Sequence, residues 1–167
     1  GGLSHADEDH LEDVAVVLLS VCADEVGVTD PARLDDAEYR RYHDEEWGTP
    51  LHGNRALFEK MALEGFQAGP SWITILRKRP RFREVFAEFE PEAVAAFGSD
   101  DIERLMTDAG IIRNRAKIIA TISNAVLVTQ MAPGALDALM WSFAPPARPR
   151  PASLADVPAV TAESEAM

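Results

Sequence analysis

The stretch "DDIERLMTDAGIIRNRAKIIATISNAVLVTQM" (residues 100–131) decides the fold, because two segments of helical apolar periodicity flank a short turn that contains glycine. Asp100, with Glu103 three residues later, resembles a capping box at the start of the first helix. We expect Gly110 to end that helix and the second helix to cover about 113–130. The sequence therefore predicts a helical hairpin.

The turn of this hairpin has the charge and geometry of an anion site. The second helix would begin with exposed backbone N–H groups, and its dipole together with Arg113, Arg115 and Lys117 favours a bound anion. Such a hairpin can hold a DNA phosphate without reading the base sequence. An ordinary pair of packed helices has the same spacing, and the spacing alone leaves both interpretations open.

The remainder of the chain also shows helical periodicity. We expect helices at 10–27 and 54–69, and no β-hairpin signal or alternating strand of useful length is present. The predicted fold class is therefore all-α. Shorter helices are expected after the turn at Asp30 and Pro31, from Trp72 with Ser71 as its cap, and from Pro80 and Pro91, each proline lying in a first turn.

Length and composition indicate one soluble domain with appendages, in a chain of 167 residues. The single cysteine, Cys22, excludes an intramolecular disulfide and suits a reducing compartment. The longest apolar run, 14–23, is too short to span a bilayer, and its acidic flank differs from a signal peptide. We expect a cytoplasmic protein with no membrane partner.

The net charge of −12 is unevenly distributed along the chain. Residues 1–50 contain 14 acidic and 3 basic residues, whereas 51–167 contain 14 and 13. The segment "RKRPRFR" (77–83) has five basic residues and no acidic one. Because phosphate binding depends on local patches, this segment leaves a DNA partner open, as it does the alternative of solvated helix ends.

Glu64 is the candidate for a buried functional carboxylate. It shares a helix face with Leu57 and Met61, and a buried carboxylate needs a partner. Aromatic residues of "YHDEEWG" (42–48) and Trp72 lie on either side of it in the sequence, and each aromatic ring attracts a cationic ring by about 0.5–2 kcal/mol. A helix cap, or a salt bridge to Arg55 or Arg113, is the structural alternative.

Four segments, in this order and spacing, resemble the 3-methyladenine DNA glycosylase I family over about residues 31–167. They are "YHDEEWGTP" (42–50), "LFEKMALEGFQAGPSWITILRKR" (57–79), "DIERLMTDAGIIRNRAKIIATISNA" (101–125) and "MWSFAPP" (140–146). The resemblance implies an all-α helix-hairpin-helix DNA glycosylase domain. It also implies an enzyme that hydrolyses the N-glycosidic bond of 3-methyladenine in alkylated double-stranded DNA, opening base excision repair, and we expect it to be a monomer.

The resemblance also implies the residues of a base pocket. Glu64 matches the catalytic residue that hydrogen-bonds the flipped base. Tyr42 and Trp72 match the stacking aromatics, Trp47 matches a pocket-wall position, and Gln67 lies in the matching pocket segment. These residues would favour a cationic base over neutral adenine, so selectivity would be largely a binding effect.

The implied DNA contacts lie in two places. The family's hairpin maps onto 108–117, which places Gly110, Arg113, Arg115 and Lys117 against the DNA. The segment after Glu64 departs from the family at Phe66 and Pro70, and Pro70 lies where a residue would approach the gap left by the flipped base. A proline there can still act as an apolar wedge.

The family's structural zinc site is incomplete in this sequence. His43 matches one ligand, but Asp30 stands where the first cysteine is expected, and the chain ends before the region with the last two ligands. One ligand cannot build a structural zinc site, so we expect no metal and no other cofactor.

The resemblance divides the chain into three parts. These are an extra helical segment at 1–29, a glycosylase core at 30–143 with its hairpin at about 100–130, and a Pro-rich connector at 144–167 after which the family's C-terminal region is absent. An alternative function is a catalytically inactive binder of alkylated DNA or of a free methylated base. A purely structural helical module would leave the aromatic residues around Glu64 unexplained.

Overall fold

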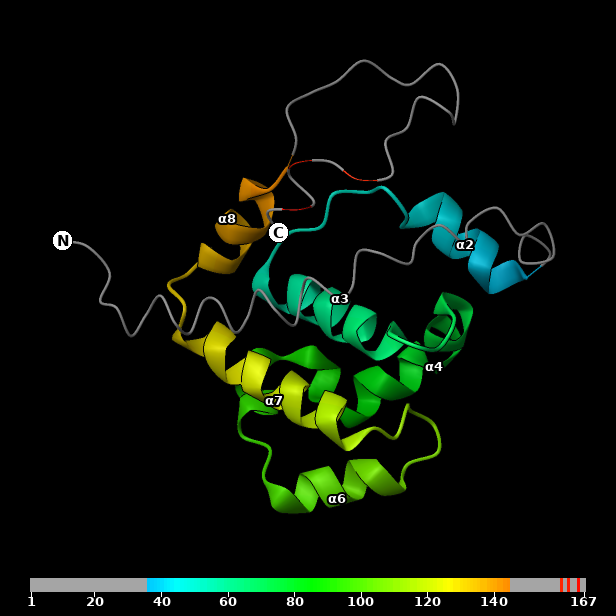
Figure 1. Cartoon of the computed structure of the whole chain (residues 1–167), viewed down its shortest axis with the longest axis vertical. Helices are drawn as coiled ribbons and strands as arrows, with labels where there is room; N and C mark the ends of the chain where they lie inside the picture. Colours follow the sequence, from blue (N-terminus) through cyan, green and yellow to red (C-terminus); the bar gives the residue numbers. More distant parts are fainter. Residues whose placement is uncertain (1–35, 145–159, 161, 163–164, 166–167) are drawn as a thin grey trace.

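The computed structural model describes residues 36–144 together with residues 160, 162 and 165 (Figure 1). The predicted helix at 10–27, the residues Cys22 and Asp30, and most of the predicted connector lie outside these described residues. Within them every regular element is helical, which confirms the all-α prediction. The elements are α2 (Ala37–Glu45), α3 (Asn54–Gln67), α4 (Trp72–Val85), the short 3-10 turn η3 (Ala87–Phe89), α5 (Pro91–Ala95), α6 (Ser99–Thr107), α7 (Arg115–Gln130) and α8 (Ala135–Ser142).

The core is a cluster of phenylalanines between α3, α4 and η3. Its members are all fully buried: Phe58, Phe66, Phe82, Phe86 and Phe89. The ring centroids of Phe66 and Phe82 lie 4.7 Å apart, and those of Phe86 and Phe89 lie 5.5 Å apart. Each buried side chain of this size contributes about 1.5–3 kcal/mol of hydrophobic free energy, so this cluster fixes α3 against α4.

Helix α7 packs against α3, α5 and α6, and Figure 1 shows it running between α3 and α6. Its buried face consists of Ile118, Thr121, Ala125 and Val128, which recur at helical spacing. Asn114 caps the helix, because its side-chain oxygen accepts a hydrogen bond from the Lys117 backbone N–H at 3.2 Å. The predicted start of this helix, near residue 113, is therefore confirmed to within two residues.

The prediction of a new helix at Pro80 is wrong, because α4 continues through Pro80 as far as Val85. Proline removes one backbone hydrogen bond from a helix interior. The Pro80 ring is exposed, whereas Phe82 two residues later is anchored in the core, so packing on both sides of the proline keeps the helix in one piece. Ser71 does occupy the position before α4, but its hydroxyl contacts the Thr74 hydroxyl at 2.9 Å and does not cap the backbone.

The start and the end of α6 also differ from the prediction. The helix begins at Ser99, and the carboxylate of Asp101 accepts a hydrogen bond from the Gly98 N–H at 3.1 Å, so the expected box of Asp100 and Glu103 is wrong. The helix ends at Thr107, three residues before Gly110. The two-residue shift of the cap, from Asp100 to Gly98, is within the ordinary scatter of helix ends.

Two features had no counterpart in the sequence prediction. The turn η3 has three consecutive non-glycine residues with φ between 51° and 55°, a left-handed conformation that L-residues adopt at a cost. The other is α8, which follows Gly134 at φ 78° and buries Leu136 against the core. Both elements depend on tertiary packing.

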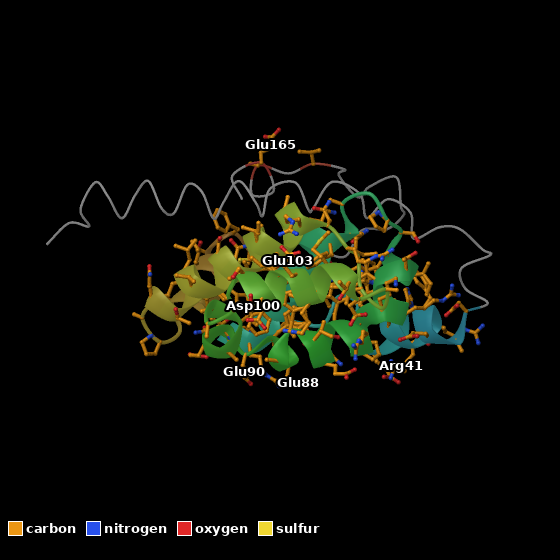
Figure 2. The ribbon with its side chains drawn as sticks, turned by 90° about the horizontal axis from the view of Figure 1, so that it is seen from below. Arg41, Glu88, Glu90, Asp100, Glu103 and Glu165 are labelled. Atoms are coloured by element: carbon orange, nitrogen blue, oxygen red, sulfur yellow. The ribbon has the colours of Figure 1, made fainter. Side chains whose placement is uncertain are left out.

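Charged side chains surround this helical body. Figure 2 shows Glu88, Glu90 and Arg41 along its periphery, pointing away from the ribbon. No single helix among the described residues is long and apolar enough to cross a membrane; α7 and α8 meet that test only as a pair bent by 110°.

Candidate functional site

A pocket of 690 Å³ lies between the end of α2, the following loop, α3 and the start of α4. Tyr42 comes from α2, Trp47 and Leu51 from the loop, Lys60 from α3 and Trp72 from the start of α4. Ligand pockets of this size are common in proteins that bind a small molecule or a single base. The pocket therefore brings together three segments that are separate in the sequence.

Tyr42 and Trp72 form the aromatic part of the pocket. Both side chains are largely buried, and their ring centroids lie 5.4 Å apart with 58° between the planes. The Nε1–H of Trp72 is buried and has no hydrogen-bond partner within the described part of the chain. The two predicted stacking residues are thus adjacent in space, although thirty residues separate them in the sequence.

The ammonium group of Lys60 occupies the space beside these rings. Its Nζ lies 4.4 Å from the centroid of the Trp72 ring and 5.6 Å from that of Tyr42, and it donates a hydrogen bond to the Tyr42 hydroxyl at 3.2 Å. It also forms an ion pair with Glu64. Burial disfavours the charged form, but Glu64 and Tyr42 outweigh this effect, so the pKa of Lys60 lies above its ordinary value.

Glu64 is buried, with 7% of its surface exposed, as the helix face shared with Leu57 and Met61 predicts. Its ion-pair partner is Lys60, one turn earlier on α3, whereas Arg55 pairs with Glu90 at 3.4 Å. Glu64 does not line the open pocket, but Lys60 does. The ammonium of Lys60 therefore lies between the pocket and the carboxylate of Glu64.

Sequence reasoning missed Lys60. The signal was present, because a lysine and a glutamate at positions i and i+4 of one helix face each other. Nothing in that spacing indicated that the pair would point toward Tyr42 and Trp72.

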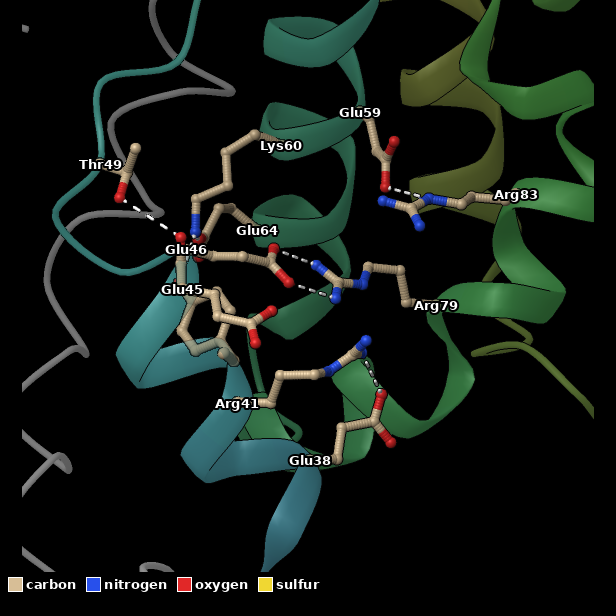
Figure 3. A network of polar contacts seen from close by, with 11 residues as sticks. Glu38, Arg41, Glu45, Glu46, Thr49, Glu59, Lys60, Glu64, Arg79 and Arg83 are labelled. Carbon is tan, nitrogen blue, oxygen red and sulfur yellow. Dashed lines mark hydrogen bonds and ion pairs between the residues drawn. The ribbon is translucent and has the colours of Figure 1, made fainter.

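Two arginine–carboxylate pairs form a wall of the pocket next to Lys60 (Figure 3). Arg79 donates two hydrogen bonds to Glu46, at 2.6 and 2.8 Å, and Arg83 donates one to Glu59 at 2.7 Å. Arg79 is buried, with 8% of its surface exposed. The bidentate contact with Arg79 outweighs the effect of burial and lowers the pKa of the Glu46 carboxyl below its ordinary value.

The loop that carries Trp47 is attached to α8. Asp137 contacts His52 Nδ1 at 2.9 Å and accepts a hydrogen bond from the Gly53 N–H at 3.1 Å. Trp141 donates from Nε1 to the Leu51 carbonyl at 3.1 Å, and its ring stacks on His52 at 4.9 Å. The unpredicted helix α8 therefore positions one edge of the pocket.

The other two predicted pocket residues, Trp47 and Gln67, differ in whether they line the pocket. Trp47 lines the pocket with 47% of its surface exposed, and its ring stacks on His43 at a centroid distance of 5.5 Å. Gln67 is the last residue of α3 and does not line the pocket. Pro70 lies half-buried in the loop between α3 and α4.

The turn between α6 and α7 is fastened to α4. Arg81 contacts Asp108 with donor–acceptor distances of 2.6 and 2.8 Å, and Lys78 donates to the Ala109 carbonyl at 2.8 Å. The Gly110 N–H donates to Asp108 at 2.7 Å, and a Cβ at Gly110 would lie 2.6 Å from Arg81 Cγ. Glycine fits here because Arg81 crosses close to its backbone and leaves little room for a Cβ.

The three basic residues of this hairpin have different surroundings. Arg115 pairs with Glu103 at 2.8 Å, and Lys117 donates to the carbonyls of Phe66 and Ala68 at the end of α3. Burial lowers the pKa of Lys117. Arg113 is exposed and, within the described part of the chain, its guanidinium makes no hydrogen bond or ion pair. Arg113 is therefore the member of this set that is open to an external anion.

The basic run 77–83 does not form an open patch. Its side chains bind acidic or carbonyl groups from other elements, with Arg77 pairing with Asp36, Lys78 with Ala109, Arg79 with Glu46, Arg81 with Asp108 and Arg83 with Glu59. These contacts connect α4 to α2, to the pocket loop, to α3 and to the hairpin. The sequence left two interpretations of this run open, a phosphate-binding patch and solvated helix ends. Neither describes these contacts.

Among the described residues, no group of three or more His, Cys, Asp or Glu side chains is arranged to hold a metal ion. His43 is half-buried, contacts Asp44 at 3.0 Å and stacks on Trp47. In the described structure, His43 therefore packs against an aromatic ring and makes a polar contact with a neighbouring carboxylate.

Comparison with known proteins gives the following matches. Residues 32–167 match the model of the methyladenine glycosylase family. DNA-3-methyladenine glycosylase 1 of Escherichia coli is 44% identical over 136 residues, which cover 79% of this chain and 73% of that protein. The DNA-3-methyladenine glycosylase of Haemophilus influenzae is 44% identical over 107 residues, covering 63% and 58% of the two chains.

Solved structures match as well. A crystal structure of 3-methyladenine DNA glycosylase I superposes with a TM-score of 0.69 at 43% identity, covering 79% of this chain and 75% of the other. A variant 3-methyladenine DNA glycosylase I in complex with 3-methyladenine gives a TM-score of 0.60 at 38% identity, covering 74% and 63%.

Proposed function

Because this chain belongs to the methyladenine glycosylase family, we propose that its pocket receives the flipped base of 3-methyladenine in alkylated DNA and that Glu64, Tyr42 and Trp72 recognise it there. The chain is a DNA-3-methyladenine glycosylase that acts in the repair of alkylated DNA. The geometry around the pocket supports the roles that we propose for individual residues.

The observation that carries the proposal is the position of a cation between two aromatic rings and a carboxylate. The Lys60 ammonium lies 4.4 Å from the Trp72 ring centroid, bonds to Tyr42 and pairs with Glu64. Aromatic faces stack on any purine, but their attraction for a positive charge and that of the carboxylate act only on a cationic ring. The same groups therefore favour a methylated, cationic adenine over an ordinary adenine.

The chemistry of the substrate fits this recognition. Methylation gives the base a positive charge, so the N-glycosidic bond breaks with its electron pair moving onto the base, which leaves neutral. Water supplies the oxygen that bonds to the sugar carbon and loses a proton. Because the cationic base is already a good leaving group, Glu64 serves to hydrogen-bond the base and favour its charged form, and Tyr42 and Trp72 hold its ring.

The base reaches the pocket after rotation out of the duplex, which costs a few kcal/mol. The hairpin 108–117 supports this step by binding the DNA backbone, with Arg113 as the exposed cation and with Gly110, Arg115 and Lys117 shaping the turn. Pro70 lies half-buried in the loop between α3 and α4, two residues before the pocket residue Trp72, and acts as the apolar wedge.

The remaining pocket residues have supporting roles. Trp47 forms an exposed wall of the pocket. Gln67 is half-buried at the end of α3 and lies outside the pocket lining, so its proposed contribution to the base site is indirect.

The test is release of 3-methyladenine from methylated duplex DNA, measured by chromatography of the free base. We expect the protein to release 3-methyladenine and no adenine from the same DNA. Tight binding of methylated DNA without base release would contradict the proposed hydrolysis and identify the chain as a binder of alkylated DNA.

A further inference from the structure

The Lys60 ammonium lies against the Trp72 ring at the pocket and pairs with Glu64. We propose that the Lys60 ammonium is a built-in occupant of the base pocket that a cationic base displaces, and that returns to Glu64 once the base has become neutral. This inference deepens the proposed function and rests on it. It makes Lys60 a specificity-determining residue.

The first argument is the match between the contacts of Lys60 and those expected of the base. Its Nζ has Trp72 at 4.4 Å, Tyr42 at 5.6 Å and Glu64 as its ion pair. These are the same three residues that we assign to recognition of the cationic base. Because one carboxylate and one pair of rings cannot hold two cations at close range, the base and the ammonium compete.

The second argument is the position of Lys60 between the pocket and Glu64. Lys60 lines the pocket, whereas Glu64 does not. A base that enters the pocket thus meets Glu64 only after the ammonium has moved aside.

The third argument is that this movement leaves the fold intact. Lys60 and Glu64 lie one turn apart on α3, so their ion pair connects no separate elements, and the movement gives up only one contact with α2, the hydrogen bond to the Tyr42 hydroxyl. The Lys60 side chain is 38% exposed, and its flexible stem allows the charged end to turn into solvent while the helix stays packed.

Charge balance gives the exchange a direction. The substrate base carries a positive charge while it is attached to the sugar, and it replaces the charge of Lys60 beside Glu64. After the glycosidic bond breaks, its electron pair neutralises the base. The neutral product no longer matches the carboxylate, so Lys60 regains its place and promotes release of the product.

A quantitative consequence is weak binding of the free, neutral base. When only a fraction of the protein has Lys60 displaced, the apparent affinity equals the intrinsic affinity multiplied by that fraction. Removal of the ammonium should therefore strengthen binding of free 3-methyladenine.

The experiment measures the dissociation constant of free 3-methyladenine, at a pH where it is neutral, through the fluorescence change of the pocket tryptophans. We expect Lys60→Met, which keeps the length of the side chain and its helix preference, to bind the base at least fivefold more tightly than the wild type. Lys60→Arg keeps the charge and should bind as the wild type does. Lys78→Met is the matched control, because it removes a lysine charge from outside the pocket.

A second measurement uses the unaltered protein and is independent of any effect on folding. Acetylation of Lys60 by a soluble acylating reagent, followed by mass spectrometry, should rise severalfold when 3-methyladenine saturates the protein. Lys78 acetylation provides the internal reference.

Unchanged or weaker base binding by folded Lys60→Met, or Lys60 acetylation that stays constant or falls at saturating base, would overturn the inference. Failure of the proposed function has a separate signature, which is absence of base release from methylated DNA by the wild type. Base release by a wild type whose Lys60 stays protected would keep the function and reject the exchange.

Discussion

On α4, Arg79, Arg81 and Arg83 each bind a carboxylate from another element, whereas Lys60 on α3 binds Glu64 one turn along its own helix. The arginine pairs connect segments that would otherwise separate, so their loss affects the fold. The Lys60–Glu64 ion pair lies within α3, so its opening breaks no ion pair between helices. The position of the partner in the chain therefore distinguishes cations that hold the fold together from a cation that is available for exchange.

The largest effect is expected for Glu64, the carboxylate that pairs with Lys60. We expect Glu64→Ala to reduce excision of 3-methyladenine by about 10- to 100-fold, since a hydrogen bond to a charged group contributes about 1.5–3 kcal/mol. The single-turnover rate of base release measures it. Glu92→Ala, which changes an exposed glutamate on α5, is the control and should act as the wild type does.

Full excision by folded Glu64→Ala would exclude this carboxylate from base recognition. The fold itself is checked by circular dichroism and the melting temperature.

The next largest effect is expected for an arginine–carboxylate pair of α4, the pair of Arg79 and Glu46. Glu46→Gln removes the charge that balances the buried Arg79, so we expect a loss of about 1–2 kcal/mol in the free energy of unfolding, less than for a fully buried pair because water screens the 40% exposed Glu46. Urea denaturation measures it. Glu84→Gln is the control, because the Arg81–Glu84 pair is exposed and lies within α4.

The Glu46–Arg79 pair also has a pH dependence with a defined sign. The folded state lowers the pKa of Glu46 below its ordinary value of 4.5, so its contribution is complete above that value and is lost as the pH falls through the lower, folded pKa. Urea midpoints between pH 6 and pH 3 should therefore fall less steeply in Glu46→Gln than in the wild type. Equal slopes would show that the pair does not contribute.

A smaller effect is expected where α4 meets the hairpin. Gly110→Ala places a Cβ 2.6 Å from Arg81 Cγ, so Arg81 must shift away from its contact with Asp108. We expect about 1–3 kcal/mol of destabilisation from this overpacking. Thermal unfolding checks it, and Gly98→Ala is the matched control, because open space surrounds that glycine. Equal melting temperatures would contradict the close approach.

The smallest effect separates a paired from an unpaired cation in the hairpin. Arg113→Ala should weaken binding to duplex DNA and reduce the slope of log K against log salt by about one, because one phosphate contact is lost. Arg115→Ala should change the slope less, since Glu103 already neutralises Arg115. Titration of fluorescent DNA at several salt concentrations checks both. A larger change for Arg115 would reverse the assignment.

Much of this arrangement was predictable from local signals. Apolar periodicity and the glycine- and proline-containing breaks gave α3, α5 and α7 near their observed positions, because these signals depend on neighbouring residues. The break assigned to Pro80 was wrong, since packing of Phe82 in the core outweighs the loss of one backbone hydrogen bond. The start of α6 depended on whether the capping box joined Gly98 to Asp101 or Asp100 to Glu103, which sequence spacing does not resolve.

Features of the site divide in the same way into those that local sequence signals predicted and those that tertiary packing decided. The burial of Glu64 followed from its place on an apolar helix face, and Tyr42 and Trp72 were named as its companions from the resemblance. Their approach to within 5.4 Å of each other was not contained in any local pattern, nor was the support of the pocket loop by α8.

The sequence by itself determined the helical class, the family and the presence of a buried carboxylate, because periodicity, motif order and polarity are properties of the chain. Only the tertiary structure decided which cation meets which carboxylate. The basic run 77–83, expected as a phosphate patch or a solvated end, became a set of connections to α2, α3 and the hairpin. Lys60 instead entered the pocket, since the packing of α3 against α4 directs that face of the helix toward Trp72. Electrostatic partners are set by distance in space, and distance in space is fixed only when the helices pack.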